Sequence, residues 1–237
     1  MPYFYHYYWD PTYILVLIGV VIVLIASAGV KSTFRRYSGQ RSMSGMTGAQ
    51  AAERILHSAG IYDVTIQHVS GSLTDHYNPA KKTLNLSDDV YGAASVAAIG
   101  VAAHECGHAI QHQNGYVPLT LRSAIVPVAN IGSTLSWPLI LIGLFFTGNT
   151  STFLISLGII CFSFAVIFQL VTLPVEFNAS SRALQILGQQ GILSDSELPY
   201  TRKVLRAAAM TYVAGAAAGL LQLLRLILLF GGRSRND

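Results

Sequence analysis

Residues 104–108 of the chain read His-Glu-Cys-Gly-His, so two histidines stand four positions apart with a glutamate directly after the first. On a helix, residues i and i+4 lie on one face a turn apart, so His104 and His108 can offer two imidazole nitrogens to one ion. Zinc takes such nitrogen ligands at about 2.0–2.1 Å. Glu105 would stand beside the ion, where it can act as general base on water that the metal activates. The motif predicts a zinc hydrolase.

A catalytic zinc site needs a third protein ligand, and the leading candidate is Glu176. It lies just past a long apolar run, after Pro174, which is expected to start a new helix. A carboxylate at the edge of an apolar segment is usually functional or paired. The alternative is an interfacial ion pair between Glu176 and Arg182. Other acidic residues lie in polar surroundings where solvation explains them: Glu53, Asp75, Asp88 and Asp89.

Three further residues are weaker candidates for the same site. Arg182 is a candidate for steadying a substrate or a ligand carboxylate, although a structural ion pair explains it equally well. His76 or Tyr212 is a candidate for stabilising the oxyanion of a tetrahedral intermediate, although a loop histidine and a packing tyrosine are the simpler readings. Cys106 points in a different direction on the helix from His104 and His108, so it is expected to be a packing residue.

The composition indicates a membrane protein. Of 237 residues, 52% are hydrophobic and 11% are charged, whereas soluble domains carry about 25% charged residues. The apolar runs predict about four transmembrane segments, the last of which carries Arg225 and either spans the membrane or lies in its interface. Lysines and arginines flank these runs rather than forming one stripe, which argues against nucleic-acid binding.

The order of the apolar and polar segments predicts a domain organisation. Residues 1–30 are expected to be an uncleaved membrane anchor, because no Lys or Arg precedes its apolar run and a basic cluster follows it. The remainder is expected to comprise a cytoplasmic catalytic region (31–123), a transmembrane hairpin (124–173), a cytoplasmic segment with the third ligand (174–206), a C-terminal transmembrane or interfacial helix (207–230) and a tail (231–237). The positive-inside rule places residues 31–41 in the cytoplasm. The arginines of the tail conflict with that rule if residues 207–230 span.

The polar region before the motif predicts a few short elements. Thr47 and Gln50 have the form of a capping box at the start of a helix that Gly60 can close. Residues 64–68 and 83–86 are expected to form a pair of short strands, with a turn at residues 77–79. A helix that carries the two histidines is expected from near Ser95 to about Asn114.

Three blocks of sequence resemble a known family. They are LTDHYNPAKKTLNLSDDVY (73–91), GVAAHECGHAIQHQNGY (100–116) and LPVEFNASSRAL (173–184). They are similar to the YugP-like neutral zinc metallopeptidases of bacterial membranes, and the resemblance covers most of the chain. It implies a gluzincin-type site in which His104, His108 and Glu176 hold the metal and Glu105 is the base.

The order of the motifs also resembles that of the HtpX and CAAX prenyl proteases. That group carries an acidic residue four positions after the ligand glutamate, whereas this chain has Ser180 there, with Asn178 nearby. The carboxylate that would orient a ligand histidine is therefore not assigned by the sequence, and Asn178 is a candidate for an outer partner of the site.

Together these observations predict a mainly α, helical integral membrane protein with about four transmembrane segments and a small, β-hairpin-containing, zincin-like catalytic region. Its expected function is zinc-dependent endopeptidase, with one Zn²⁺ per chain, a membrane-associated peptide or protein substrate, and an active site on the cytoplasmic side of the cell membrane. Two alternatives remain: a non-catalytic membrane scaffold with a structural zinc, and a zinc hydrolase of a non-peptide bond. Glu105 argues against the scaffold, because a structural site needs no base.

Overall fold

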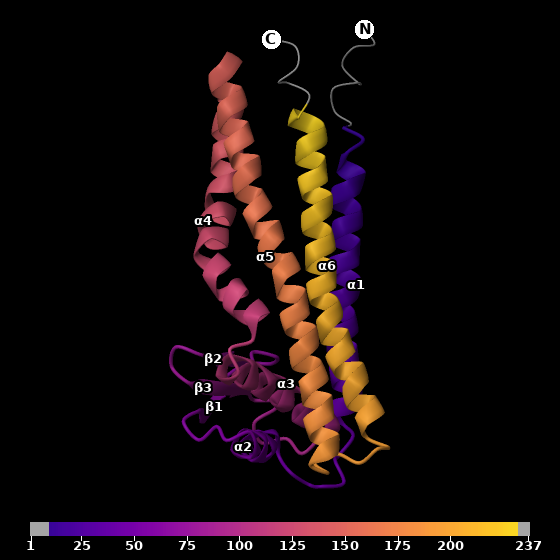
Figure 1. The fold of residues 1–237 in the computed structure, drawn as a ribbon. Helices are drawn as coiled ribbons and strands as arrows, with labels where there is room; N and C mark the ends of the chain where they lie inside the picture. The colour runs from indigo at the N-terminus through magenta and orange to yellow at the C-terminus, as the bar shows by residue number, and fades with distance from the viewer. Residues whose placement is uncertain (1–9, 232–237) are drawn as a thin grey trace. The chain divides into compact units, whose positions relative to one another are not determined.

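The computed structural model describes residues 10–231; the aromatic residues before Asp10, and the tail from residue 232, lie outside them. The described residues are mainly α-helical, as predicted (Figure 1). The elements are α1 (Tyr13–Ser38), α2 (Gly48–Ser58), β1 (Thr65–Val69), β2 (His76–Asn78), β3 (Thr83–Ser87), α3 (Val96–Gln113), α4 (Val117–Phe145), α5 (Gly148–Gln189) and α6 (Leu198–Phe230).

The chain divides into two compact units. One, which we call the apolar unit, comprises residues 1–26, 121–172 and 212–237, and the other, the site unit, comprises residues 27–120 and 173–211. Within residues 10–231, four helices are long and apolar enough to cross a membrane, namely α1, α4, α5 and α6. Many of their large apolar side chains are exposed, as lipid-facing residues would be, including Leu24, Ile25, Phe145 and Phe153. The prediction of four spanning helices is confirmed in length and composition.

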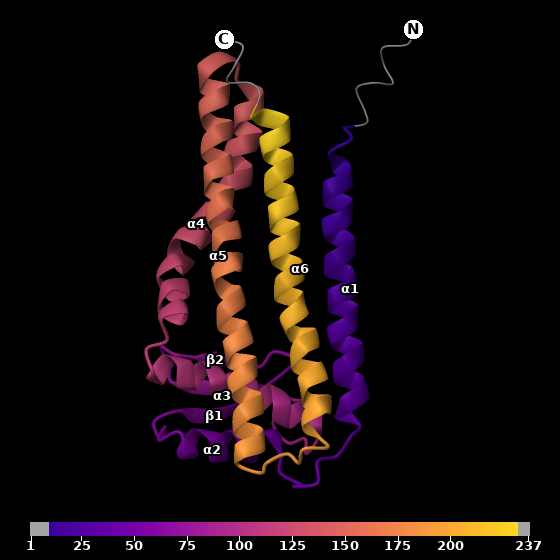
Figure 2. The same cartoon turned by 45° about the vertical axis from the view of Figure 1, so that its right-hand side comes forward.

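Small residues and one ion pair join the helices of the apolar unit, which run alongside one another in Figure 2. Gly158 of α5 lies so close to α4 that a Cβ there would be 2.8 Å from the carbonyl oxygen of Ser136, and small residues allow such close helix packing in membranes. Arg225 of α6 lies 3.2 Å from Asp10, and its guanidinium carbon lies 4.2 Å from the centroid of the Tyr13 ring. The basic residue in the last apolar run is therefore paired within the protein.

Helix α5 is longer than the sequence predicted. It begins at Gly148 and continues through Pro174 to Gln189, so the new helix expected at Pro174 does not exist. Proline inside a helix removes one backbone hydrogen bond. A stripe of completely buried residues at four-residue spacing supports the helix beyond that point: Val175, Ala179, Ala183 and Leu187. This continuity places Glu176 on the same helix that contributes to the apolar unit.

The strands of the site unit form one small sheet in the order β1-β3-β2. β1 and β3, which correspond to the predicted pair, are parallel, so they do not form the hairpin. The hairpin is formed by β2 and β3, which are antiparallel, and β2 was missed because its residues were read as a turn. Asn78 Oδ1 accepts hydrogen bonds from the backbone amides of Ala80 and Lys81, so the turn begins only after Asn78. β2 is last in the strand order, so it is an edge strand.

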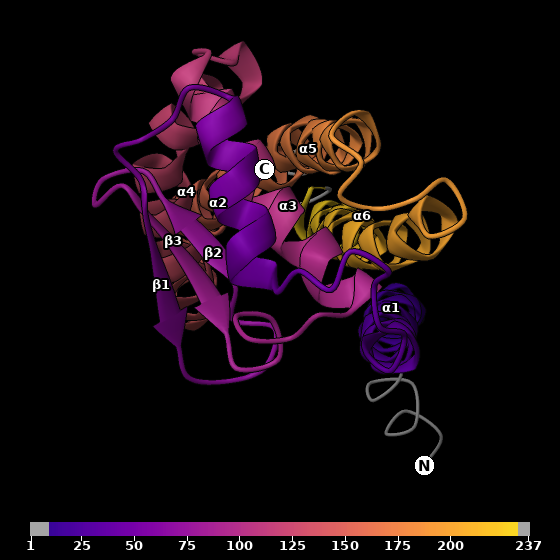
Figure 3. The same cartoon turned by 90° about the horizontal axis from the view of Figure 1, so that it is seen from below.

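The sheet, α2 and α3 contribute to one hydrophobic core, and Figure 3 shows these elements from below. The predicted capping box is present, with Thr47 Oγ1 accepting from the amide of Gln50 at the start of α2, and Gly60 follows the helix with φ +72°. α3 begins where predicted, directly after Ser95, whose hydroxyl caps the helix. α3 is the central element, because its small residues are almost fully buried: Ala97, Ala98, Ala102, Ala103, Cys106 and Ala109.

Gly107 sets the distance between α3 and α5. A Cβ at this position would lie 2.7 Å from the carbonyl oxygen of Ala179, which is closer than side-chain carbons approach backbone oxygens. The obstacle is backbone, so one helix would have to move to make room. Glycine between the two histidines therefore permits the helix contact that positions them.

We expect Gly107→Ala to lower the stability of the site unit by about 1–3 kcal/mol, the usual cost of overpacking a dense core. Gly92→Ala is the matched control, because a Cβ at Gly92 would meet nothing within 4 Å. Thermal unfolding of the detergent-purified proteins measures both. Equal unfolding temperatures for Gly107→Ala and Gly92→Ala would show that the helices are not in tight contact.

Candidate metal centre

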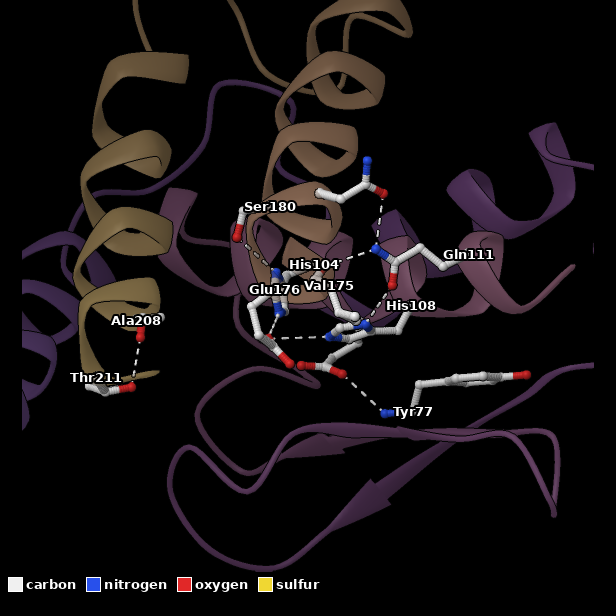
Figure 4. Close-up of polar contacts among 11 residues, drawn as sticks. Tyr77, His104, His108, Gln111, Val175, Glu176, Ser180, Ala208 and Thr211 are labelled. Carbon is white, nitrogen blue, oxygen red and sulfur yellow. Dashed lines mark hydrogen bonds and ion pairs between the residues drawn. The ribbon is translucent and has the colours of Figure 1, made fainter. Parts of the chain in front are cut away.

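Two histidines and a glutamate from two helices converge in the site unit, as Figure 4 shows. His104 and His108 lie one turn apart on α3, and Glu176 lies on α5. Glu176 Oε2 lies 3.3 Å from Nε2 of His104 and 3.5 Å from Nε2 of His108. One ligand atom from each of the three lies within 4.8 Å of the other two. The structure therefore brings together the three residues that the sequence nominated as metal ligands.

The burial and chemistry of these residues fit a zinc ion. Glu176 is only 2% exposed, and a buried carboxylate is costly unless positive charge or hydrogen bonds compensate it. Imidazoles that act as metal ligands are neutral, so His104 and His108 in that state bring no charge of their own. A divalent cation among the three groups would compensate the carboxylate, and two histidines with one glutamate are a donor set of catalytic zinc sites.

The outer nitrogen of each histidine faces a neutral oxygen. His104 Nδ1 lies 3.1 Å from the hydroxyl of Ser180, and His108 Nδ1 lies 3.0 Å from Oε1 of Gln111. Such outer partners fix the ring orientation of ligand histidines. The sequence analysis identified Ser180 only as a position that lacks an acid, and it missed Gln111. The available signal was spacing, because Gln111 is three residues after His108 and so adjoins it on a helix.

His108 holds its proton more firmly than a histidine in water. Burial lowers its pKa, but the hydrogen bond to Glu176 and the negative charge of Glu105 outweigh that effect, so the pKa of His108 is raised above its usual value in the metal-free protein. A metal must displace this proton in order to bind Nε2. Zinc affinity is therefore expected to fall as the pH falls through the pKa of His108.

Glu105 lies on α3 next to His104, and its carboxylate is mostly buried, with 8% of the residue exposed. Its Oε2 accepts a hydrogen bond from the backbone N–H of Tyr77 in β2, at 3.0 Å. β2 is in turn held at one end by Asp75, whose carboxylate accepts from both the amide and the hydroxyl of Ser87 at 2.8 Å. Burial, and the nearby charge of Glu105, raise the pKa of Asp75. The edge strand and the candidate base are thus directly connected.

Asn178 and Arg182 lie on α5, within two helical turns after Glu176. Arg182 Nε donates to Asn178 Oδ1 at 2.7 Å, and the Arg182 guanidinium carbon lies 5.9 Å from the centroid of the Tyr116 ring. Asn178 Oδ1 also accepts a hydrogen bond from the side-chain amide of Gln111. Both predicted outer residues are therefore connected to the histidine helix through Gln111.

The two candidates for the oxyanion remain predictions. His76 lies on β2 with its Nδ1 2.9 Å from the carbonyl oxygen of Thr74 and its Nε2 3.2 Å from the side-chain amide of Asn85. Tyr212 belongs to the apolar unit. Cys106 is fully buried, and its thiol donates to the carbonyl of Ala52 over 3.6 Å, as a packing residue would.

Comparisons with known proteins agree with this chemistry. Residues 12–231 match the model of a family described as "Putative neutral zinc metallopeptidase". The chain is 50% identical over 208 residues to "Putative membrane protease YugP" of Bacillus subtilis (strain 168), an alignment that covers 87% of this chain and 91% of that protein. No solved structure matches the chain. Because the family model spans nearly all of the sequence, the chain belongs to this family of neutral zinc metallopeptidases.

Proposed function

We propose that the chain is a membrane-embedded zinc endopeptidase that holds one zinc ion with His104, His108 and Glu176. The observation that carries the proposal is the convergence of these three groups in a buried site, with their ligand atoms within 4.8 Å of one another. Membership of a zinc metallopeptidase family supports hydrolysis of peptide bonds. The name of the relative, a membrane protease, supports action at a membrane.

In the proposed reaction, Glu105 is the general base and then the general acid. Zinc, when bound, supplies a Lewis acid that lowers the pKa of water and polarises a carbonyl group. Glu105 accepts a proton from the attacking water and later donates it to the leaving amine nitrogen, so each cycle consumes one water and breaks one peptide bond. The N–H of Tyr77 holds one oxygen of this carboxylate, which fixes its direction before substrate arrives.

The edge strand β2 is the proposed docking place for the substrate. β3 occupies one side of β2, whereas the N–H of Tyr77 points to the other side, toward Glu105. An extended peptide can add to such an edge as a further strand, with its backbone bonded to that of β2. The bonds of Asp75 to Ser87 would keep β2 in place during docking. Peptides or unfolded segments of membrane-associated proteins are therefore the expected substrates.

The proposed location is the cell membrane, crossed several times, with the site on the cytoplasmic side. The support is a basic cluster at the end of α1 and directly after it, consisting of Lys31, Arg35, Arg36 and Arg41. Positive residues beside a spanning segment favour the cytoplasmic face. This cluster belongs to the site unit, as do the metal ligands.

We expect Glu105→Gln to keep zinc and to lose about 10²–10⁴-fold in the rate of peptide cleavage, because the amide cannot accept a proton. Glu53→Gln is the matched control, since Glu53 is an exposed glutamate on α2. Zinc content by atomic absorption and cleavage of an unfolded test protein in detergent measure the two quantities. Wild-type cleavage by Glu105→Gln would reject this residue as the base.

We expect Tyr77→Pro to cleave peptides about tenfold or more slowly than Tyr77→Ala, because only the proline removes the backbone N–H that holds Glu105, and one such hydrogen bond contributes about 0.5–1.5 kcal/mol, or more when its partner is charged. Both variants lose the tyrosine ring and its bond to His112, so the alanine variant controls for the side chain. Proline is tolerated on edge strands. Equal kcat/KM values for the two variants would show that this hydrogen bond is not needed to position Glu105.

A further inference from the structure

A run of polar side chains joins the metal-binding face of α3 to α5, and we call it the Gln111 relay. It consists of His108, Gln111, Asn178 and Arg182, in that order. Gln111 is completely buried, although a glutamine side chain has two donor hydrogens and an acceptor to satisfy. In this structure every one of those groups has a partner. Gln111 is therefore fully satisfied inside the relay, whose other members are partly buried.

The donors and acceptors of the relay can be assigned from its own geometry. Arg182 can only donate, so the atom of Asn178 that it contacts at 2.7 Å must be the oxygen. That oxygen lies 2.9 Å from the Gln111 side chain, which must therefore donate to it through its amide nitrogen. The same nitrogen donates to the carbonyl of Val175, also at 2.9 Å.

The direction of the Gln111 side chain determines which nitrogen of His108 carries a proton. Because both amide hydrogens of Gln111 point to acceptors, its oxygen is the atom that faces His108 Nδ1, at 3.0 Å. An oxygen without hydrogen can only accept, so Nδ1 of His108 must carry a proton. In neutral His108 the lone pair is then on Nε2, the atom that lies 3.5 Å from Glu176. That tautomer is the one that can bind a metal next to Glu176.

We propose that Gln111 is a positioning residue that presets His108 in its metal-binding tautomer, and that Arg182, acting through Asn178, fixes the direction of Gln111. The inference rests on the proposed function, because it assigns a role toward the zinc ligand His108. It also explains how α3 and α5 are locked at the site, since Gln111 binds the carbonyl of the residue directly before Glu176. One side chain thereby holds two of the three ligands in register.

His104 offers an internal comparison. Its Nδ1 faces the hydroxyl of Ser180, and a hydroxyl can either donate or accept. Ser180 therefore does not dictate which nitrogen of His104 carries the proton, whereas Gln111 does so for His108. Loss of the outer partner is accordingly expected to weaken zinc binding more at His108 than at His104.

Gln111→Met tests the proposal, because methionine fills a similar volume and forms none of the three bonds. We expect zinc affinity, measured on the full-length protein in detergent by competition with a chromophoric chelator, to fall about 10–100-fold, as is usual when an outer partner of a ligand histidine is lost. Ser180→Ala should lose less. Thr201→Val is the matched control, since Thr201 is completely buried and binds a carbonyl of α3 far from the ligands, that of Val96.

A merely structural role would give a different pattern. Gln111→Met and Thr201→Val would then both lower the unfolding temperature of the chelator-treated protein, and both would keep wild-type zinc affinity; that result would overturn the proposal. If Gln111→Met does not fold, Arg182→Met decides, because it removes the end of the relay without touching His108. We expect it to weaken zinc binding and Arg182→Lys, which can still donate to Asn178, to restore most of the affinity. Equal affinities for both Arg182 variants and the wild type would also overturn the proposal.

Different results would reject the proposed metal site and the proposed role of Gln111. A wild-type protein that binds no zinc would reject the metal site itself. A wild-type protein that binds zinc, together with relay variants that bind it equally well, would reject only the role of Gln111.

Discussion

The carboxylate of Glu176 is buried beside two imidazoles, and the packing of the site unit must accommodate this buried charge. A charged oxygen taken out of water must be compensated by positive charge or by hydrogen bonds. Glu176 Oε2 has Nε2 of both His104 and His108 within 3.5 Å. A divalent metal ion among these atoms would supply the charge, and it would account for why the mostly apolar helix α3 carries two histidines and a glutamate in sequence.

Meeting that constraint requires two helices to approach closely. Gly107 lets α3 come against the backbone of α5 at Ala179, and Gly100 makes a similar approach to Thr201 of α6. Helix α5 must also continue without a break through Pro174, because Glu176 follows it by two residues. The buried residues beyond the proline hold that turn in place. The polar site is thus positioned by small residues at the helix contacts as well as by the Gln111 relay.

The outer partners of the histidines are neutral, and this affects the reactivity of the metal. A carboxylate in contact with a ligand histidine raises its basicity and so tunes the metal. Here an amide oxygen and a hydroxyl take those places, so they add no negative charge to that of Glu176. In the proposed zinc site, the expected consequence is a more electrophilic metal. In the proposed reaction, the proton is carried by Glu105, which accepts a hydrogen bond from the N–H of Tyr77 in β2.

Much of this arrangement could be predicted from the sequence, and the residues show where the limit lies. His104, Glu105 and His108 follow a helical spacing that is visible in five residues, and the caps at Thr47 and Ser95 are local signals. Their positions within α2 and α3 followed directly.

The features that the sequence did not predict depend on contacts between distant parts of the chain. The continuation of α5 beyond Pro174 depends on tertiary packing, which overrides the local preference of proline. The parallel pairing of β1 with β3 depends on a crossover that no local pattern records. The role of Gln111 was missed because two of its three partners, Val175 and Asn178, are separated from it by more than 60 residues along the chain.

The most direct test of the account is the zinc content per chain of the detergent-purified protein, compared with that of His104→Ala and Glu176→Ala. The account predicts one zinc per wild-type chain and loss of zinc in both variants, with Glu53→Ala, at an exposed position, retaining it. Full zinc in Glu176→Ala would show that another residue is the third ligand. A wild-type protein without zinc at neutral pH, even after incubation with the metal, would contradict the central claim.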